Sequence, residues 1–274
     1  MDSIQILGSA AAEGIPAIFC SCRVCREALR NGGKDMRMRT AYKISERVRI
    51  DFGPDSIAQE HRFQLHSENL RHLFFTHSHW DHLDFTLLTC RSKGMSHPER
   101  LLHVYGNTGV MRTIREALDP ELDYLMELHQ LEYFVPVELP EEGLTFHPLI
   151  ADHLYTEEPI IYAIRRGGKW LLIANDTGLP PEADWEYMHK LNMRFSAVIA
   201  DCTGLKLDLP RNHMGGKYTV EFMERLRSEG LMAESGRFII NHFSHNGGFT
   251  HAEAEEHFGR FGIVTGYDGM IVEY

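Results

Sequence analysis

Short apolar runs separated by polar turns make up most of the hydrophobic pattern of the chain. Runs of this length, bounded by turn residues, are typical of buried β-strands. The run that ends in "LFFT" is followed directly by a cluster of polar residues, so one of these strands is expected to carry a loop of unusual chemistry. The expected strands are Ser3–Gly8, Ala41–Gly53, Leu70–Thr76, Leu101–Gly106, Gly143–Ile150, Pro159–Arg166, Lys169–Asp176, Phe195–Cys202, Arg237–Phe243 and Met270–Tyr274.

Helical patterns lie between several of these strands. Helices are expected at Thr108–Leu118, Pro180–Leu191, Lys217–Gly230 and Thr250–Arg260. Thr108 is a candidate N-cap, a proline opens the second helix, and Gly230 ends the third. Strands are grouped early and alternate with helices later, and no repeat or low-complexity linker marks a boundary. The pattern predicts one α/β domain over residues 1–274.

Composition and charge narrow the functional classes. The chain has 274 residues, of which 43% are hydrophobic, enough for a sizeable core. Its net charge of −11 disfavours nucleic-acid binding, in which Lys and Arg must neutralise phosphates. Asp2, Glu13 and Pro16 do not suit a secretory signal, and no apolar run is long enough for a membrane span. A cytoplasmic protein without membrane contact is therefore expected.

The stretch "HSHWDH" holds four candidate metal ligands in six residues. They are His77, His79, Asp81 and His82. Imidazole and carboxylate together suit Zn, Mn or Fe, and such polar groups are costly to bury without ions. The plain alternative is a solvated histidine-rich loop.

Other expected strands also end in candidate ligands, which favours the metal interpretation. His153 follows "LIAD", Asp176 ends "LLIAND", and His242 ends "FIIN". Metal and catalytic residues are often held on loops at strand ends by a rigid scaffold. Each of the three residues alone would be an ordinary histidine or aspartate; together with "HSHWDH" they predict one site.

The five cysteines indicate a second metal site. An odd number of cysteines in a long chain that is expected to be intracellular argues against a disulfide framework. Cys20, Cys22 and Cys25 form C-x-C-x-x-C, and His245 could complete a tetrahedral zinc site. Such a site would tie the N-terminal loop to the loop that carries His242. Three buried free thiols or a labile disulfide are the alternatives; Cys90 and Cys202 are expected to be ordinary buried thiols.

The order of these motifs resembles the metallo-β-lactamase superfamily. The resemblance rests on "HSHWDH" after a strand, followed by a later His, an Asp and a last His. It implies a four-layer αβ/βα sandwich with two metals in a cleft at the sheet edges. Carried over residue by residue, it places His77, His79 and His153 on one metal, Asp81, His82 and His242 on the second, and Asp176 between the two. It implies a hydrolase in which paired ions supply hydroxide near neutral pH.

One branch of the superfamily matches nearly end to end, namely the phosphoribosyl 1,2-cyclic phosphate phosphodiesterases of phosphonate catabolism. The matching stretches include "GSAAAEGIPAIFCSCRVC", "NDTGLP", "PRNH", "NHFSH" and "YDGM". This resemblance implies a phosphodiesterase that acts on a small cyclic or diester phosphate through a metal-bridging hydroxide. It implies a structural zinc on Cys20, Cys22, Cys25 and His245, and it places His213 in the substrate pocket. His213 and Asp81 are the expected catalytic residues, and backbone amides near the helix after His213 are expected to help hold phosphate.

Other functions of the same fold stay open at this point. A tRNA 3′-processing endonuclease shares the loop but would need a basic arm, which the sequence lacks. A lactone or thioester hydrolase, a relative of the pyrroloquinoline quinone pathway and a non-catalytic zinc-binding protein are the others. The expected partner is a small phosphodiester substrate and not nucleic acid; a homodimer is kept open.

Two stretches of the chain depart from the family pattern, and ten histidines have no expected role in it. Ala10–Ala12 stand where relatives carry glycines, and the segment 119–134 matches poorly and is a candidate for shaping substrate access. No role is expected for the remaining histidines, which are His61, His66, His72, His97, His103, His129, His147, His189, His251 and His257.

Overall fold

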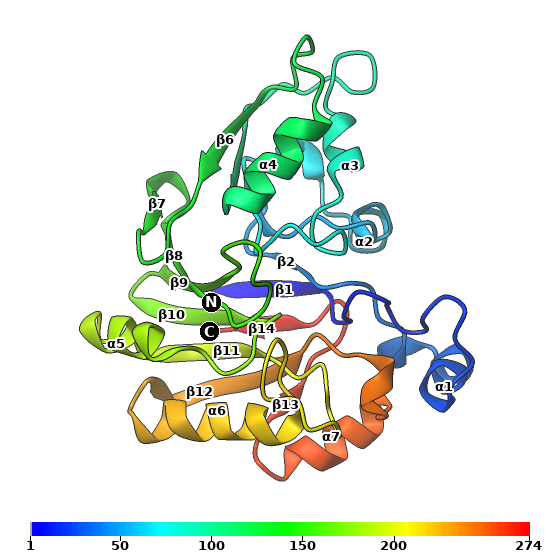
Figure 1. Cartoon of the computed structure of the whole chain (residues 1–274), viewed down its shortest axis with the longest axis vertical. Helices are drawn as coiled ribbons and strands as arrows, with labels where there is room; N and C mark the ends of the chain where they lie inside the picture. The colour runs from blue at the N-terminus through cyan, green and yellow to red at the C-terminus, as the bar shows by residue number, and fades with distance from the viewer. Residues whose placement is uncertain (1) are drawn as a thin grey trace.

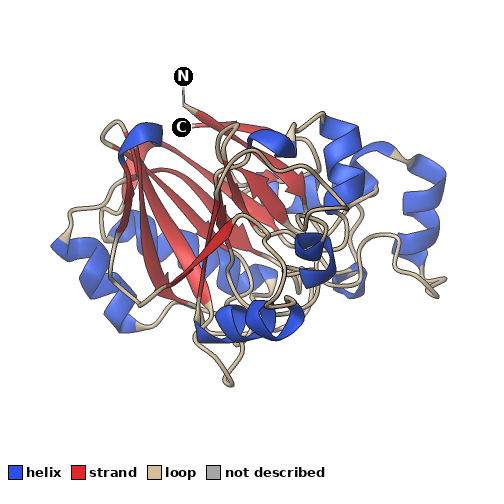
Figure 2. Cartoon of the chain, turned by 90° about the horizontal axis from the view of Figure 1, so that it is seen from above, coloured by secondary structure: helices blue, strands red, loops and turns tan. Residues whose placement is uncertain are grey.

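The computed structural model describes residues 2–274, whose strands form two seven-stranded sheets. The strand order is β14-β1-β2-β3-β4-β5-β6 in the first sheet and β13-β12-β11-β10-β9-β8-β7 in the second. Each sheet is antiparallel on one side and parallel on the other. The sheets lie between helices in Figures 1 and 2, so the predicted four-layer αβ/βα sandwich is confirmed.

The strands of the first sheet are β1 Ser3–Gly8, β2 Ala41–Lys43, β3 Val48–Ile50, β4 His72–Phe74, β5 Leu102–Gly106, β6 Met126–Gln130 and β14 Ile271–Glu273. Those of the second are β7 Val137–Leu139, β8 Leu144–Ile150, β9 Ile160–Arg166, β10 Lys169–Ala174, β11 Phe195–Asp201, β12 Met232–Asn241 and β13 Val264–Thr265. The α-helices are α1 Arg23–Asn31, α2 Ser56–Phe63, α3 Phe85–Thr89, α4 Thr108–Ala117, α5 Glu182–Lys190, α6 Gly216–Ser228 and α7 His251–Gly259. Short 3-10 turns are η1 Gly33–Asp35, η2 Ser67–Asn69, η3 Pro140–Glu142 and η4 His245–Gly247.

The inner faces of the two sheets enclose one apolar core. Phe74 of β4 stacks on Phe146 of β8 with ring centroids 3.9 Å apart, and Tyr162 of β9 meets both rings edge-on. All three side chains are fully buried. Truncating either phenylalanine to alanine is expected to cost about 3–5 kcal/mol. This core fixes the positions of the strand ends that carry the site.

Helices cover the outer faces of both sheets. The outer side of the first sheet packs against α3 and α4 through Leu88 and Met111. The second sheet packs against α5, α6 and α7 through Trp185, Phe222 and Phe258. The central strands of the second sheet are therefore buried on both faces, which explains their continuous apolar runs.

The sequence missed or misplaced several elements. Ala41–Gly53 is not one strand but the antiparallel pair β2 and β3, because the polar stretch between them turns the chain. The N-cap of α4 is Asn107, whose side chain accepts a hydrogen bond from the Val110 amide, and not Thr108. The poorly matching segment 119–134 contributes β6, an edge strand of the first sheet.

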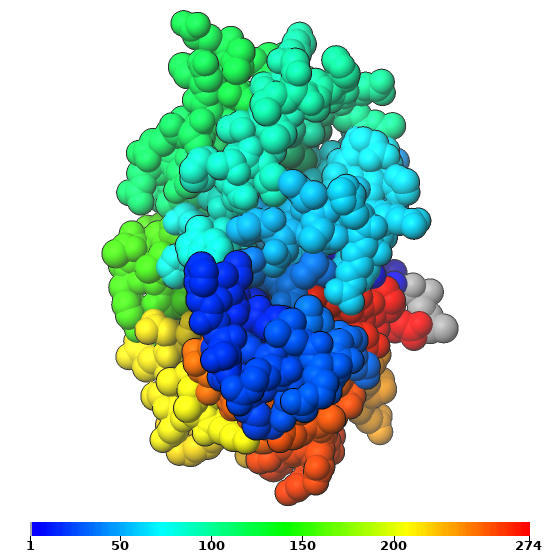
Figure 3. All heavy atoms as spheres, turned by 90° about the vertical axis from the view of Figure 1, so that its right-hand side faces the viewer, coloured from blue at the N-terminus to red at the C-terminus, as the bar shows by residue number. Residues whose placement is uncertain are grey.

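The N-terminal part of the chain packs against the C-terminal part. Strand β1 pairs with β14, so the two ends of the chain lie side by side in Figure 1. Figure 3 shows the blue N-terminal segment lying against orange C-terminal residues. Arg23 in α1 donates to both carboxylate oxygens of Glu253 in α7, at 3.0 and 2.9 Å.

Among the helices of residues 2–274, none has the length and apolar composition of a membrane span.

Candidate metal centre

The predicted ligands gather where four strands end. His77, His79, Asp81 and His82 follow β4, His153 follows β8, Asp176 follows β10, and His242 follows β12. Asp176 and His242 both adopt a left-handed backbone, with φ of 50° and 62°. This conformation is uncommon outside glycine and is found disproportionately at functional sites. The strand ends thus bring together residues that are far apart in the sequence.

Three histidines form the first group of donor atoms. The His79 Nδ1 lies 2.9 Å from the His77 Nε2 and 3.2 Å from the His153 Nε2. The three donor atoms lie within 4.8 Å of one another, which is compatible with a single ion.

Asp81, His82 and His242 form the second group, and Asp176 lies between the two groups. The His82 Nε2 is 3.2 Å from an Asp81 oxygen and 2.9 Å from the Asp176 Oδ2. The His242 Nε2 is 2.8 Å from the same Asp176 oxygen. The other oxygen of Asp176 lies 3.6 Å from the His153 Nε2 in the first group. One carboxylate therefore faces both groups, as a bridging ligand does.

Unpartnered polar atoms show that this pocket suits cations. The His82 Nε2, the His242 Nε2 and the Asp176 Oδ2 are buried and have no hydrogen-bond partner. They approach one another closely, but their angles are not those of hydrogen bonds. Leaving three such atoms unsatisfied would cost several kcal/mol, on the order of 1–3 kcal/mol each. Divalent ions bound to these donors would remove that cost.

The second ring nitrogen of each buried histidine is held by another group. Such contacts fix the tautomer and the ring orientation of metal-ligating histidines. The strongest joins the His82 Nδ1 to Asp51, at 2.7 Å, and Asp51 also accepts from the Thr76 amide at 2.9 Å. The remaining contacts are His77 Nδ1 with the Thr76 hydroxyl, His153 Nδ1 with the Asn212 carbonyl and His242 Nδ1 with the Thr203 hydroxyl.

Burial and the neighbouring charges set the protonation of the cluster. Burial lowers the pKa of His77 well below its usual value, so this ring is neutral, as a ligand must be. Burial also acts to lower the pKa of His82, but the carboxylates of Asp176 and Asp81 outweigh it and raise that pKa. Burial opposes ionisation of Asp176, yet His242 and His82 hold the pKa of this carboxyl well below its usual range. The pocket therefore concentrates negative charge that attracts cations.

His213 lies beside the two donor groups. Its ring stacks against His242, with centroids 5.6 Å apart, and its Nδ1 is 3.2 Å from an oxygen of Asp201. Asp201 is fully buried and also accepts from the amides of Asp176 and Met214. Burial alone would lower the pKa of His213, but the hydrogen bond and charge of Asp201 raise it to about 9.

The donor groups open into a cavity of about 460 Å³. Its walls include His213 and residues of the first loop, Ala11, Ala12 and Glu13. Three of the amides near the start of α6, where phosphate is expected to bind, are already engaged within the fold. The amides of Met214, Gly215 and Gly216 already donate to Asp201, Leu209 and Leu205.

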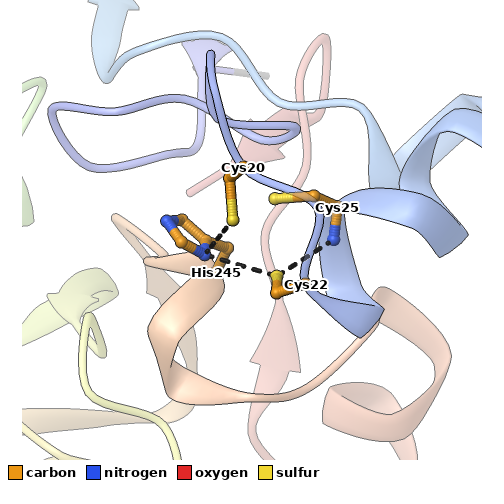
Figure 4. Close-up of side chains that lie close together, drawn as sticks. All are labelled: Cys20, Cys22, Cys25 and His245. Carbon is orange, nitrogen blue, oxygen red and sulfur yellow. Dashed lines mark hydrogen bonds between the residues drawn. The ribbon is translucent and has the colours of Figure 1, made fainter.

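The cysteine motif meets His245 as the sequence suggested (Figure 4). The His245 Nδ1 lies 3.6 Å from the Cys20 sulfur and 3.5 Å from the Cys22 sulfur, and Cys25 completes the group. All the cysteines are free, so a disulfide does not explain the motif. Cys202 is buried as expected, whereas Cys90 is exposed.

Local hydrogen bonds prepare the cysteine cluster for a metal. Cys22 is the N-cap of α1, and its sulfur accepts from the Cys25 amide at 3.4 Å. Burial acts to raise the pKa of Cys22, but this bond and His245 lower it to about 6, so the thiolate is available at neutral pH. The His245 Nε2 lies 3.7 Å from Glu13, which also lines the cavity of the donor groups. The cysteine cluster thus supports one wall of that cavity.

Comparison with known families decides the classification. Residues 46–242, more than half of the chain, match the family described as the beta-lactamase superfamily domain. The chain belongs to the β-lactamase superfamily. As a member, it shares the fold and the divalent-metal donor groups of a superfamily of metal-dependent hydrolases.

Solved structures show the same fold over almost the whole chain. A diphosphatase of the PhnP family is 23% identical, with a TM-score of 0.77 over 99% of this chain and 96% of that one. Zinc-bound PqqB from Methylobacterium extorquens is 17% identical, with a TM-score of 0.74 over 99% and 100% of the two chains. The short form of human tRNase Z is 16% identical, with a TM-score of 0.65 over 99% and 98%.

One curated relative matches part of the chain. It is an octanoyltransferase of Porphyromonas gingivalis (strain ATCC BAA-308 / W83), 34% identical over 120 residues. The match covers 41% of this chain, and the chain spans only about a fifth, 22%, of that protein.

The sequence did not single out the residues that orient the ligands. Asp51 ends the run "VRID" at a strand end, as Asp176 ends "LLIAND", so its position was a usable signal. Asp201 ends the run "FSAVIAD" in the same way, whereas Thr76 and Thr203 had no comparable signal, because a buried threonine has many structural uses. Their roles emerge only when the strand ends are brought together.

Proposed function

We propose that this protein is a dinuclear metal-dependent phosphodiesterase that hydrolyses a small cyclic or diester phosphate. The observation that carries the proposal is the position of His213, which shares the cavity with both donor groups and is hydrogen-bonded to buried Asp201. In this proposal, His77, His79 and His153 hold one ion, Asp81, His82 and His242 hold the other, and Asp176 bridges them. Cys20, Cys22, Cys25 and His245 hold a structural zinc. One catalytic domain spans residues 1–274.

Bound Mn, Zn or Fe ions would supply a water of lowered pKa and positive charge that stabilises the phosphoryl group under attack. The chain itself contributes the proton for the leaving oxygen. The His213 Nδ1 is engaged by Asp201, which leaves the Nε2 to face the substrate. A positioned general acid of this kind typically contributes about 10²–10⁴-fold to the rate.

The dimensions of the site favour a small substrate. The cavity of about 460 Å³ has room for a sugar phosphate or nucleotide. A second cavity of about 740 Å³ shares the His153 wall and is lined by Tyr133, Tyr155 and Arg211. This second cavity offers room for the alcohol half of a diester. The net charge of −11 gives no support to nucleic-acid binding.

Two of the structural relatives are named for phosphate-ester or phosphate-anhydride chemistry, the diphosphatase and the tRNase, which supports phosphorus as the centre attacked. The expected location in the cytoplasm and the homodimer stay predictions.

A leaving-group experiment tests this proposal. Metal-loaded protein is compared with the His213→Asn variant on bis(p-nitrophenyl) phosphate, whose phenolate leaves without a proton, and on a cyclic ribose phosphate, whose alkoxide needs one. The variant is expected to lose about 10²–10⁴-fold on the cyclic substrate and much less on the aryl diester. His61→Asn, in the exposed part of α2, is the matched control. Turnover of a lactone or thioester without turnover of either diester would contradict the proposal, as would an equal loss on both diesters.

A further inference from the structure

A further group of candidate metal ligands lies at the other end of the first sheet. Strands β5 and β6 pair in parallel, with His103 opposite Glu127 and Tyr105 opposite His129. Side chains two residues apart on a strand point to the same face, so His103, Glu127 and His129 share one face. His103 also pairs with His72, the first residue of β4, whereas the proposed catalytic loop follows the last residue of that strand. The group is therefore separate from the centre described above.

The donor atoms of this group lie close enough together to share one ion. The His103 Nδ1 is 3.0 Å from the His129 Nε2 and 3.5 Å from the Glu127 Oε2, and the latter two atoms are 4.0 Å apart. Zinc binds such donors at about 2.0–2.2 Å, so neighbouring donors around a tetrahedral ion lie about 3.3 Å apart. The histidines of the proposed catalytic centre show similar spacings, 2.9 and 3.2 Å.

The side chains of this group are reachable from solvent. The His103 and His129 side chains are 29% and 32% exposed, and Glu127 is 56% exposed. The Glu127 carboxylate adds an anionic oxygen donor to the two imidazoles. A hydrogen bond between the two rings would use one nitrogen of each but gives no role to this carboxylate.

We propose that His103, Glu127 and His129 bind one Zn²⁺ ion at a site distinct from both the dinuclear centre and the cysteine cluster. Two imidazoles and a carboxylate suit zinc, and the exposed side leaves the fourth position to water. The ion would link β5 to the edge strand β6, which has a neighbour on one side only. Unlike the proposed phosphodiesterase activity, this site needs no substrate and no catalytic turnover.

Zinc counting tests the proposal. Protein with its other metal sites filled is dialysed against buffered Zn²⁺, and bound zinc is measured by mass spectrometry. Wild type is expected to bind one more zinc per chain than His103→Ala or His129→Ala, while the control His61→Ala, which removes an exposed imidazole of α2, binds as wild type does.

The Glu127→Gln variant guards against misfolding, because it removes only a charge from an exposed side chain. It is expected to weaken binding of the extra zinc at least tenfold while its thermal unfolding without added zinc matches wild type. Equal zinc content in wild type, His103→Ala and His129→Ala would overturn the proposal. So would an unchanged zinc affinity in Glu127→Gln.

Discussion

Replacing Asp51 by asparagine tests how the fold prepares the metal centre. Asp51 is 2% exposed and accepts from the His82 Nδ1 at 2.7 Å and from the Thr76 amide at 2.9 Å. Its backbone is left-handed, with φ of 63°, a conformation that asparagine tolerates well. The substitution therefore preserves shape and backbone while it removes one acceptor oxygen and the charge.

The consequence for His82 follows from the hydrogen-bond directions. If the amide oxygen keeps the Thr76 bond, the amide NH₂ faces the His82 Nδ1 and must donate to it. The ring proton then moves to Nε2, the atom that would bind the metal. A hydrogen bond to a charged group contributes about 1.5–3 kcal/mol. At about 1.4 kcal/mol per tenfold, metal affinity should fall about 10- to 150-fold.

The assay is equilibrium dialysis of metal-free protein against a series of buffered zinc concentrations, with turnover of an aryl phosphodiester measured alongside. Asp51→Asn should need more zinc for half-occupancy of the dinuclear centre, and excess metal should restore its turnover. Asp208→Asn, which removes an exposed carboxylate, should bind as wild type does. A folded Asp51→Asn variant with wild-type zinc affinity would refute the reasoning about the tautomer.

Two further predictions concern the cysteine cluster and the response to acid. Cys22→Ser should lose one zinc and lower the thermal midpoint by at least about 5 °C, with turnover changed only a few-fold; unchanged zinc content would remove the structural site. His251 accepts from the Arg37 guanidinium at 2.9 Å, beside Glu255 and Lys34, and burial and Arg37 lower its pKa from 6.5 to about 4. As the pH falls, His251 is therefore protonated in the unfolded chain before it is protonated in the folded chain. Stability is lost as the pH falls from 6.5 to 4. In urea unfolding, the stability of His251→Gln should therefore fall less steeply over this pH range than that of wild type, by up to about 1.4 kcal/mol per pH unit. Parallel curves of stability against pH for wild type and variant would show the assignment to be wrong.

Strands with strong apolar patterns were predictable from the sequence, and weakly patterned elements were not. Ser3–Gly8 is found as predicted, and β8 to β11 fall within a few residues of their apolar runs. Strand β6 carries Glu127, His129 and Gln130 beside its two apolar residues, and its partly exposed position at the sheet edge leaves no hydrophobic run. Helix α1 is similarly polar on most of its surface and was not predicted. The cysteine motif at its start was recognised.

The ligand residues were easier to predict from the sequence than the residues that hydrogen-bond to them. Histidine and aspartate at consecutive strand ends, such as Asp176 and His242, are unusual enough to be noticed one by one. Asp201 ends β11 in the same way, but its partners His213 and Met214 come from a loop whose path no local pattern reveals. For the same reason, the sequence did not reveal that the amides of Met214, Gly215 and Gly216 donate to other residues of the fold. Tertiary hydrogen bonding decided both cases.

The most direct test of the central claim is the rate of bis(p-nitrophenyl) phosphate hydrolysis by manganese-loaded protein, measured together with metal content for wild type and His79→Ala. The account predicts turnover by wild type, and a folded variant that has lost both that turnover and at least one metal ion of the dinuclear centre. Full turnover in His79→Ala, or no turnover by wild type with its metals in place, would contradict it.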